Sequence, residues 1–118
     1  MNKSILCGRL TREPDIKYTD KTTVARFNLA VNRQYKRDES DFISCVAFGK
    51  TAEFIEKYII KGTKILVEGR IQTGSYTDQQ GLKHYTTDVV VEQVEFAESK
   101  KKENPADGFQ NIADEVPP

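Results

Sequence analysis

Apolar and polar residues alternate along most of the first 97 positions, which is the two-residue period of β-strands. The alternation predicts strands over residues 3–10, 23–31, 42–48, 64–73 and 85–96. In the last of these the apolar phase slips between Val91 and Val94, which predicts a β-bulge near Glu92 and Gln93. Between the first two strands, Pro14 lacks a backbone donor and predicts a turn or irregular segment over residues 13–15.

One segment has a helical period instead. Ala52, Ile55 and Ile59 recur at helical spacing, while Thr51 suits the N-cap and Gly62 the C-terminal end. We therefore predict a short helix over residues 51–59. Three strands, one helix and two strands is the order of the OB fold. The predicted fold class is all-β: a five-stranded OB-fold barrel with one short helix between strands 3 and 4.

The third predicted strand carries two phenylalanines on one face. Phe42 and Phe48 share that face with Ser44 and Val46, whereas the alternate residues of the strand are apolar and form a core face. For an isolated strand, burial of both faces is the simpler interpretation. The alternative is an open sheet face on which aromatic rings, flanked by cations, stack unpaired nucleic-acid bases.

Charge is unevenly distributed although the net charge is zero. Residues 1–77 contain 14 Lys and Arg against 9 Asp and Glu, a net of +5, and residues 78–118 contain 4 against 9, a net of −5. Because a phosphate-binding surface needs only local cations, a basic body remains compatible with nucleic acid as a partner. No apolar run approaches the roughly 20 residues of a membrane-spanning helix, and no signal peptide is recognisable, so we expect a cytoplasmic protein without a membrane partner.

The chain offers little for catalysis or metal binding. Cys7 and Cys45 fall on expected core-facing positions and lack a CxxC spacing, so we expect buried free thiols and no zinc site. His84 is the single histidine and is expected at the surface. No nucleophile–base pair or phosphate-binding loop is recognisable, so we expect no enzyme, no catalytic residue, no metal and no cofactor.

Composition changes near residue 99. We expect the OB domain to span residues 1–98, a linker 99–106, and a flexible acidic C-terminal tail 107–118. On composition the tail is either a frayed terminus or a short peptide that docks elsewhere through carboxylates and apolar anchors.

Several sequence blocks occur in the order and spacing of one known family. They are residues 2–18, with Gly8-Arg9-Leu10 and Glu13-Pro14-Asp15; 24–33; 46–53 followed by 58–62; and 67–73 followed by 76–81 and 85–91. Together they resemble the bacterial and phage single-stranded DNA-binding proteins. The resemblance implies sequence-independent binding of single-stranded DNA, its protection in replication, recombination and repair, and a homotetramer. An RNA-binding OB protein and a protein-interaction OB module are the alternatives.

The resemblance also implies roles for individual residues. The base-stacking aromatics of the family fall on Tyr35, Phe42, Phe48 and Tyr76. Three of these positions are often tryptophan in the family, whereas this chain has none, so each ring offers a smaller stacking surface. Phosphate contacts are expected from Lys3, Arg9, Arg33, Lys36, Arg37, Lys50, Lys61 and Arg70. Some members carry further cations before the fourth aromatic; Gln72, Gly74 and Ser75 stand there, so the dependence of binding on salt should be weaker.

The resemblance assigns a partner-binding role to the tail. In the family the tail ends in acidic residues, an apolar residue, proline and phenylalanine, and it recruits replication and repair proteins. The matching residues are Asp114, Glu115, Val116, Pro117 and Pro118, with Pro118 where the family has phenylalanine. Because a terminal aromatic is the usual anchor of such a contact, its replacement should weaken partner binding.

Overall fold

The structure is a computed structural model that describes residues 1–36 and 38–98. The expectations for Arg37, the linker 99–106 and the tail 107–118 lie outside the described residues. The elements in chain order are β1 (Ser4–Leu10), β2 (Asp15–Tyr18), β3 (Thr23–Asn32), β4 (Ser40–Phe48), α1 (Gly49–Tyr58), β5 (Lys64–Thr77) and β6 (Lys83–Phe96).

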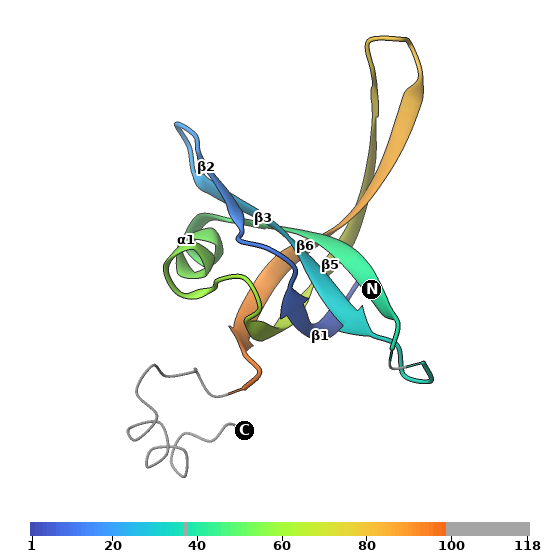
Figure 1. The fold of residues 1–118 in the computed structure, drawn as a ribbon. Coiled ribbons are helices and arrows are strands. Elements are labelled where there is room, and N and C mark those ends of the chain that lie inside the picture. Colours follow the sequence, from blue (N-terminus) through green and yellow to red (C-terminus); the bar gives the residue numbers. More distant parts are fainter. Residues whose placement is uncertain (37, 99–118) are drawn as a thin grey trace, which may run out of the picture.

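Within the described residues, five of the strands close into a barrel. Around the barrel the order is β1, β5, β6, β4 and β3, and β3 returns to β1 through the pairs Arg9–Ala30 and Leu10–Leu29. Neighbouring strands are antiparallel except β4 and β6, which run parallel. The single described helix lies between β4 and β5, the third and fourth barrel strands (Figure 1). The predicted OB-fold barrel is therefore confirmed.

The core is formed by the residues of the barrel strands whose side chains point inward. Ala25 and Leu29 of β3, and Ile65 of β5, have no exposed surface. Ile55 of α1 is equally buried and belongs to the same cluster, so the helix packs against the barrel core. Burying the apolar stripe of α1 in this cluster stabilises the helix, whose N-cap Phe48 provides no side-chain hydrogen bond. The expected Thr51 cap is therefore wrong.

The predicted irregular segment ends at Pro14, because a strand that was not predicted begins at Asp15. Residues Asp15–Tyr18 pair antiparallel with β3, and a turn in which the Thr19 backbone N–H donates to the Thr22 carbonyl at 2.8 Å connects them. Pro14 precedes the strand, so it removes no ladder hydrogen bond. The Tyr18 hydroxyl donates to Glu56 of α1, which ties this added strand to the helix.

The predicted bulge in the last strand is confirmed by the register of β5 and β6. Glu68 pairs with Gln93, but the next residue Gly69 pairs with Val91, which leaves Glu92 as the extra residue. Beyond the bulge the two strands continue to Thr77 and Lys83 and form a long hairpin that projects from the barrel (Figure 1). The strands thus extend further than the pattern of apolar residues indicated.

The two cysteines differ from expectation. Cys45 is buried as predicted, and this burial raises the pKa of its thiol to about 12. Cys7, in contrast, is exposed, so its predicted core position is wrong. On β1 the buried residues are Gly8 and Leu10, and Cys7 alternates with them on the outward side.

Candidate nucleic-acid interface

The phenylalanines of β4 lie on its outward face. Phe42 is 69% exposed and Phe48 48% exposed, whereas the alternate residues Cys45 and Ala47 are completely buried. Burial of both faces, the simpler interpretation of the isolated strand, is therefore wrong at the two aromatic positions. Val46, between the phenylalanines, is only 4% exposed, so this face is partly packed at its centre.

The same face continues across β6 to β5. The Ser44 hydroxyl of β4 donates to Asp88 of β6 at 2.7 Å, and Asp88 pairs with Gln72 of β5. Four pairs further along this hairpin, Tyr76 stands opposite His84. Because residues two apart share a face, Tyr76 lies on the face that carries Phe42 and Phe48. We call these three exposed rings and the outward residues between them the aromatic face; Tyr76 is 57% exposed.

Tyr35 lies apart from the strands, in the loop between β3 and β4, and is 90% exposed. Beside it, the Arg33 guanidinium donates to Asp41 at 2.8 Å and 3.0 Å and to Glu39 at 3.0 Å. The hydrogen bond to Asp41 raises the pKa of Arg33. The loop is therefore tied to the start of β4 through Arg33, while the Tyr35 ring is open to a ligand.

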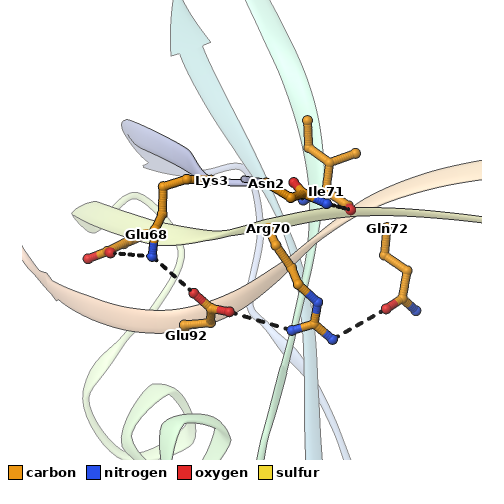
Figure 2. Close-up of polar contacts among 7 residues, drawn as sticks. All are labelled: Asn2, Lys3, Glu68, Arg70, Ile71, Gln72 and Glu92. Atoms are coloured by element: carbon orange, nitrogen blue, oxygen red, sulfur yellow. Dashed lines mark hydrogen bonds and ion pairs between the residues drawn. The ribbon is translucent and has the colours of Figure 1, made fainter.

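Several predicted phosphate contacts already have carboxylate partners. Lys3 lies 2.8 Å from Glu68 and 3.5 Å from Glu92, and Arg70 lies 3.5 Å from the other oxygen of Glu92 (Figure 2). Arg70 also donates to Gln72 at 3.4 Å. The hydrogen bond to Glu68 raises the pKa of the Lys3 ammonium. Glu92, the bulge residue, thus bridges two of the predicted phosphate-binding cations.

The N-terminal residues are held in place for this cluster. The Asn2 side chain donates to the Ile71 carbonyl at 2.8 Å and accepts from the Ile71 backbone N–H at 2.9 Å (Figure 2). These two hydrogen bonds resemble those of one residue pair in an antiparallel ladder. They hold the N-terminal residues, and with them Lys3, against β5.

The remaining predicted cations fall into two groups. Arg9 donates to Glu98 through two nitrogens at 3.1 Å, so it is also paired. Lys36, Lys50 and Lys61 are exposed and form no ion pair with any residue in the described ranges. Phosphate can therefore bind these three lysines without displacing a carboxylate of any described residue.

Sequence reasoning missed two cations beside the aromatic face. Arg26 of β3 stands opposite Val46, and Lys17 of β2 stands opposite Val24, which itself pairs with Phe48. Both side chains are exposed. The alternation of residues 23–31 had already placed Arg26 outward, whereas Lys17 was missed because no strand was predicted over residues 16–18.

The hairpin end of the aromatic face contains a second ring. The Tyr76 and His84 rings are stacked, with centroids 4.9 Å apart and planes inclined by 19°. His84 Nε2 lies 2.7 Å from Asp78 Oδ2 in the hairpin turn. Tyr85, the next residue along β6, points to the reverse face of the hairpin and is 77% exposed, with the Lys83 ammonium 5.5 Å from its ring centroid.

Residues 1–36 and 38–98 contain no group of three or more His, Cys, Asp or Glu side chains placed to hold a metal ion. None of the helices described there is both long and apolar enough to cross a membrane.

Fold and surface together define a class of protein, an OB-fold barrel with aromatic rings exposed on an outward sheet face. The chain belongs to the single-strand binding protein family, which matches residues 1–97. A protein of Clostridium perfringens named single-stranded DNA-binding protein is 57% identical over 101 residues, covering 84% of this chain and 67% of the relative.

Two further relatives extend this comparison. A single-stranded DNA-binding protein of Lactiplantibacillus plantarum is 46% identical over 105 residues, 85% of this chain and 52% of the relative. Single-stranded DNA-binding protein 2 of Clostridium acetobutylicum is 47% identical over 109 residues, 88% of this chain and 82% of the relative. The chain therefore matches about half the length of the Lactiplantibacillus protein and most of the Clostridium acetobutylicum protein.

Proposed function

We propose that this protein binds single-stranded DNA largely without sequence specificity and without catalysing a reaction. The observation that carries the proposal is the exposure of Phe42, Phe48 and Tyr76 on one continuous sheet face. Every base has a flat π-face, so stacking on such rings tolerates any sequence. In a duplex the bases already stack on one another, so single strands are favoured. Tyr35 contributes a fourth stacking position from its loop.

The phosphates are contacted by lysines and arginines around these rings. Lys36, Lys50 and Lys61 bind phosphate without competition from a described carboxylate. Arg26 and Lys17 bind phosphate beside Phe48. Binding by Lys3, Arg9, Arg33 and Arg70 requires that phosphate replaces a carboxylate. Arg37 belongs to the same proposed set. Each phosphate contact on a single strand contributes about −0.7 to the slope of log affinity against log salt.

In the cell we propose a cytoplasmic homotetramer that protects single-stranded DNA in replication, recombination and repair. The family and the names of the relatives support this role. The proposed tail residues Asp114, Glu115, Val116, Pro117 and Pro118 recruit replication or repair proteins. Sedimentation equilibrium tests the tetramer: a mass of one or two chains would refute it.

The experiment that tests the proposed binding is fluorescence anisotropy of a labelled oligo-dT, titrated with protein at two salt concentrations. The same length of duplex DNA and of oligo-U serve as competitors. We expect tight binding to oligo-dT that weakens with salt, and weak competition by both competitors. Equal competition by oligo-U would favour an RNA-binding OB protein. No binding at low salt would leave a protein-interaction module.

A pair of variants locates the binding face. We expect Phe48→Ala to weaken binding to oligo-dT by about 5- to 150-fold, because a stacked base contributes roughly 1–3 kcal/mol. Tyr85→Ala is the matched control, since it removes an exposed aromatic from the reverse face of the hairpin. It should bind like the unaltered protein. If Tyr85→Ala weakens binding as much as Phe48→Ala, the aromatic face is not the specific site.

A further inference from the structure

The tip of the β5–β6 hairpin is built around Asp78. The Gln80 and Leu82 backbone N–H groups both donate to Asp78 Oδ1 at 2.9 Å. The Asp78 backbone N–H donates to the Leu82 carbonyl at 2.9 Å, and the Gly81 N–H donates to the Asp78 carbonyl at 3.0 Å. Gly81 has a φ of 86°, which glycine adopts without strain. The Oδ1 atom of Asp78 and the backbone N–H and carbonyl of the same residue thus hold the turn together.

The second carboxylate oxygen of Asp78 holds His84. The His84 Nε2 lies 2.7 Å from it, and this contact is the main cause that lowers the pKa of Asp78. The Nε2 donates here, because an ionised carboxylate only accepts. The imidazole is therefore fixed at its edge by a turn that is itself held by backbone hydrogen bonds.

His84 in turn covers one face of the Tyr76 ring. The two residues are directly opposite each other in the β5–β6 ladder, and their rings stack at 4.9 Å with an angle of 19°. Tyr76 stays 57% exposed, so the rest of its surface is open. Tyr35, by comparison, has no ring stacked against it among the described residues.

We infer that His84 is a positioning residue for the base-stacking site at Tyr76. The stacked His84 ring, which Asp78 and the turn place against Tyr76, holds the Tyr76 ring in one orientation, with one face filled and the other presented to a base. The stacking contact, and not the bond to Asp78, orders Tyr76. Because the ring is ordered before the base arrives, binding loses less side-chain entropy. This inference rests on the proposed function, since it requires Tyr76 to stack a base.

Affinity measurements on three variants test the inference. We expect Tyr76→Ala to weaken oligo-dT binding, and His84→Ala to weaken it by roughly three- to tenfold, the worth of one aromatic contact. His84→Phe keeps a stacked ring but loses the bond to Asp78, and it should restore binding to within about threefold of the unaltered protein. Thermal melting checks that each variant is folded.

A spectroscopic measurement separates positioning from a general loss of structure. The chain has no tryptophan, so Tyr76→Trp introduces a single reporter at the stacking position. Time-resolved anisotropy of this indole should show faster local motion when His84→Ala is added, and slow motion again with His84→Phe.

The outcomes distinguish the inference from the proposed function. If Tyr76→Ala weakens binding but His84→Ala does not, the inference is overturned and stacking at Tyr76 stands. If His84→Phe binds as weakly as His84→Ala, ring stacking is not the cause, and the inference is also overturned. If Tyr76→Ala has no effect, both the inference and the stacking role of Tyr76 fail, while Phe48→Ala still tests the rest of the face.

Discussion

At the scale of single residues, the availability of a cation near the aromatic face for phosphate depends on its ion pairs with carboxylates. Glu92 is the extra residue of the bulge. Its carboxylate oxygens lie 3.5 Å from the Lys3 ammonium and 3.5 Å from the Arg70 guanidinium. Exposed ion pairs of this kind contribute little to stability. Their larger effect is on binding, because a phosphate must compete with the carboxylate for each cation.

We expect Glu92→Gln to bind single-stranded DNA more tightly than the unaltered protein. Removing this carboxylate frees Arg70 and part of the Lys3 charge, so the log–log salt slope should steepen by about 0.7–1.4, the value of one to two phosphates. Anisotropy titrations over a range of salt concentrations measure both effects. Glu95→Gln is the matched control, because Glu95 is an exposed acid on the same strand without an ion pair to any described residue. Equal gains in the two variants would mean that net charge alone is responsible.

The Cys45 thiol should be unreactive in the folded protein. Burial raises its pKa to about 12, so at pH 8 it is both protonated and shielded from reagents. Since Cys7 is exposed, the measurement is made in the Cys7→Ser variant with a thiol reagent such as dithionitrobenzoate. We expect no fast modification in buffer and one thiol per chain in denaturant. Fast modification in buffer would contradict the burial of Cys45.

At the scale of elements, the β5–β6 pair positions most of the candidate site, and its bulge depends on a glycine. A Cβ on Gly69 would lie 2.1 Å from the Val90 carbonyl oxygen, a backbone atom that cannot move aside. We expect Gly69→Ala to lower the free energy of unfolding by about 1–3 kcal/mol or more. Denaturant melts measure the loss. Gly74→Ala on the same strand is the control, since its Cβ would meet the Thr86 hydroxyl at 3.2 Å and should be better tolerated.

The hairpin turn should lose stability in acid. The pKa of Asp78 is lowered from its ordinary value of 3.8 chiefly by the bond from His84, so the ionised carboxylate stabilises the fold above pH 3.8. That contribution is lost as the pH falls through the lower pKa of the folded state. We expect the difference in melting temperature between the unaltered protein and Asp78→Asn to be largest near pH 6 and to shrink below pH 3.8. A constant difference down to pH 2.5 would show that ionisation of Asp78 does not stabilise the turn.

The elements also show where sequence reasoning succeeded and where it failed. The alternation of β3 and β4 was strong enough to assign faces, and the phase slip located the bulge at Glu92, because both signals are local. β2 was missed since four residues after a proline form a strand only when β3 pairs with them. The stacked Tyr76 and His84 depend on the register across the hairpin, which the pattern of a single strand does not fix.

At the scale of the whole molecule, the number of available cations differs from the number that the sequence indicates. Eight Lys and Arg residues were expected to contact phosphate, but Lys3, Arg9, Arg33 and Arg70 each face a carboxylate. Side-chain pairing of this kind joins residues far apart in the chain, such as Arg9 with Glu98, so it could not be predicted from local composition. The uneven charge of the chain therefore overstates the positive potential of the barrel.

The salt dependence of binding distinguishes these two counts. Phosphate contacts from nine described cations, the paired Lys3, Arg9, Arg33 and Arg70 included, would give a log–log slope of about −6.3 per bound chain. The five that have no ion pair among the described residues, Lys17, Arg26, Lys36, Lys50 and Lys61, give about −3.5 alone. We expect the shallower slope, measured by anisotropy of a labelled oligo-dT from low to moderate salt. A slope near −6.3 would mean that the carboxylates release their cations when DNA binds, and Glu92→Gln should then leave the slope unchanged. A shallow slope that steepens in Glu92→Gln would instead identify the acidic partners as the limit on affinity.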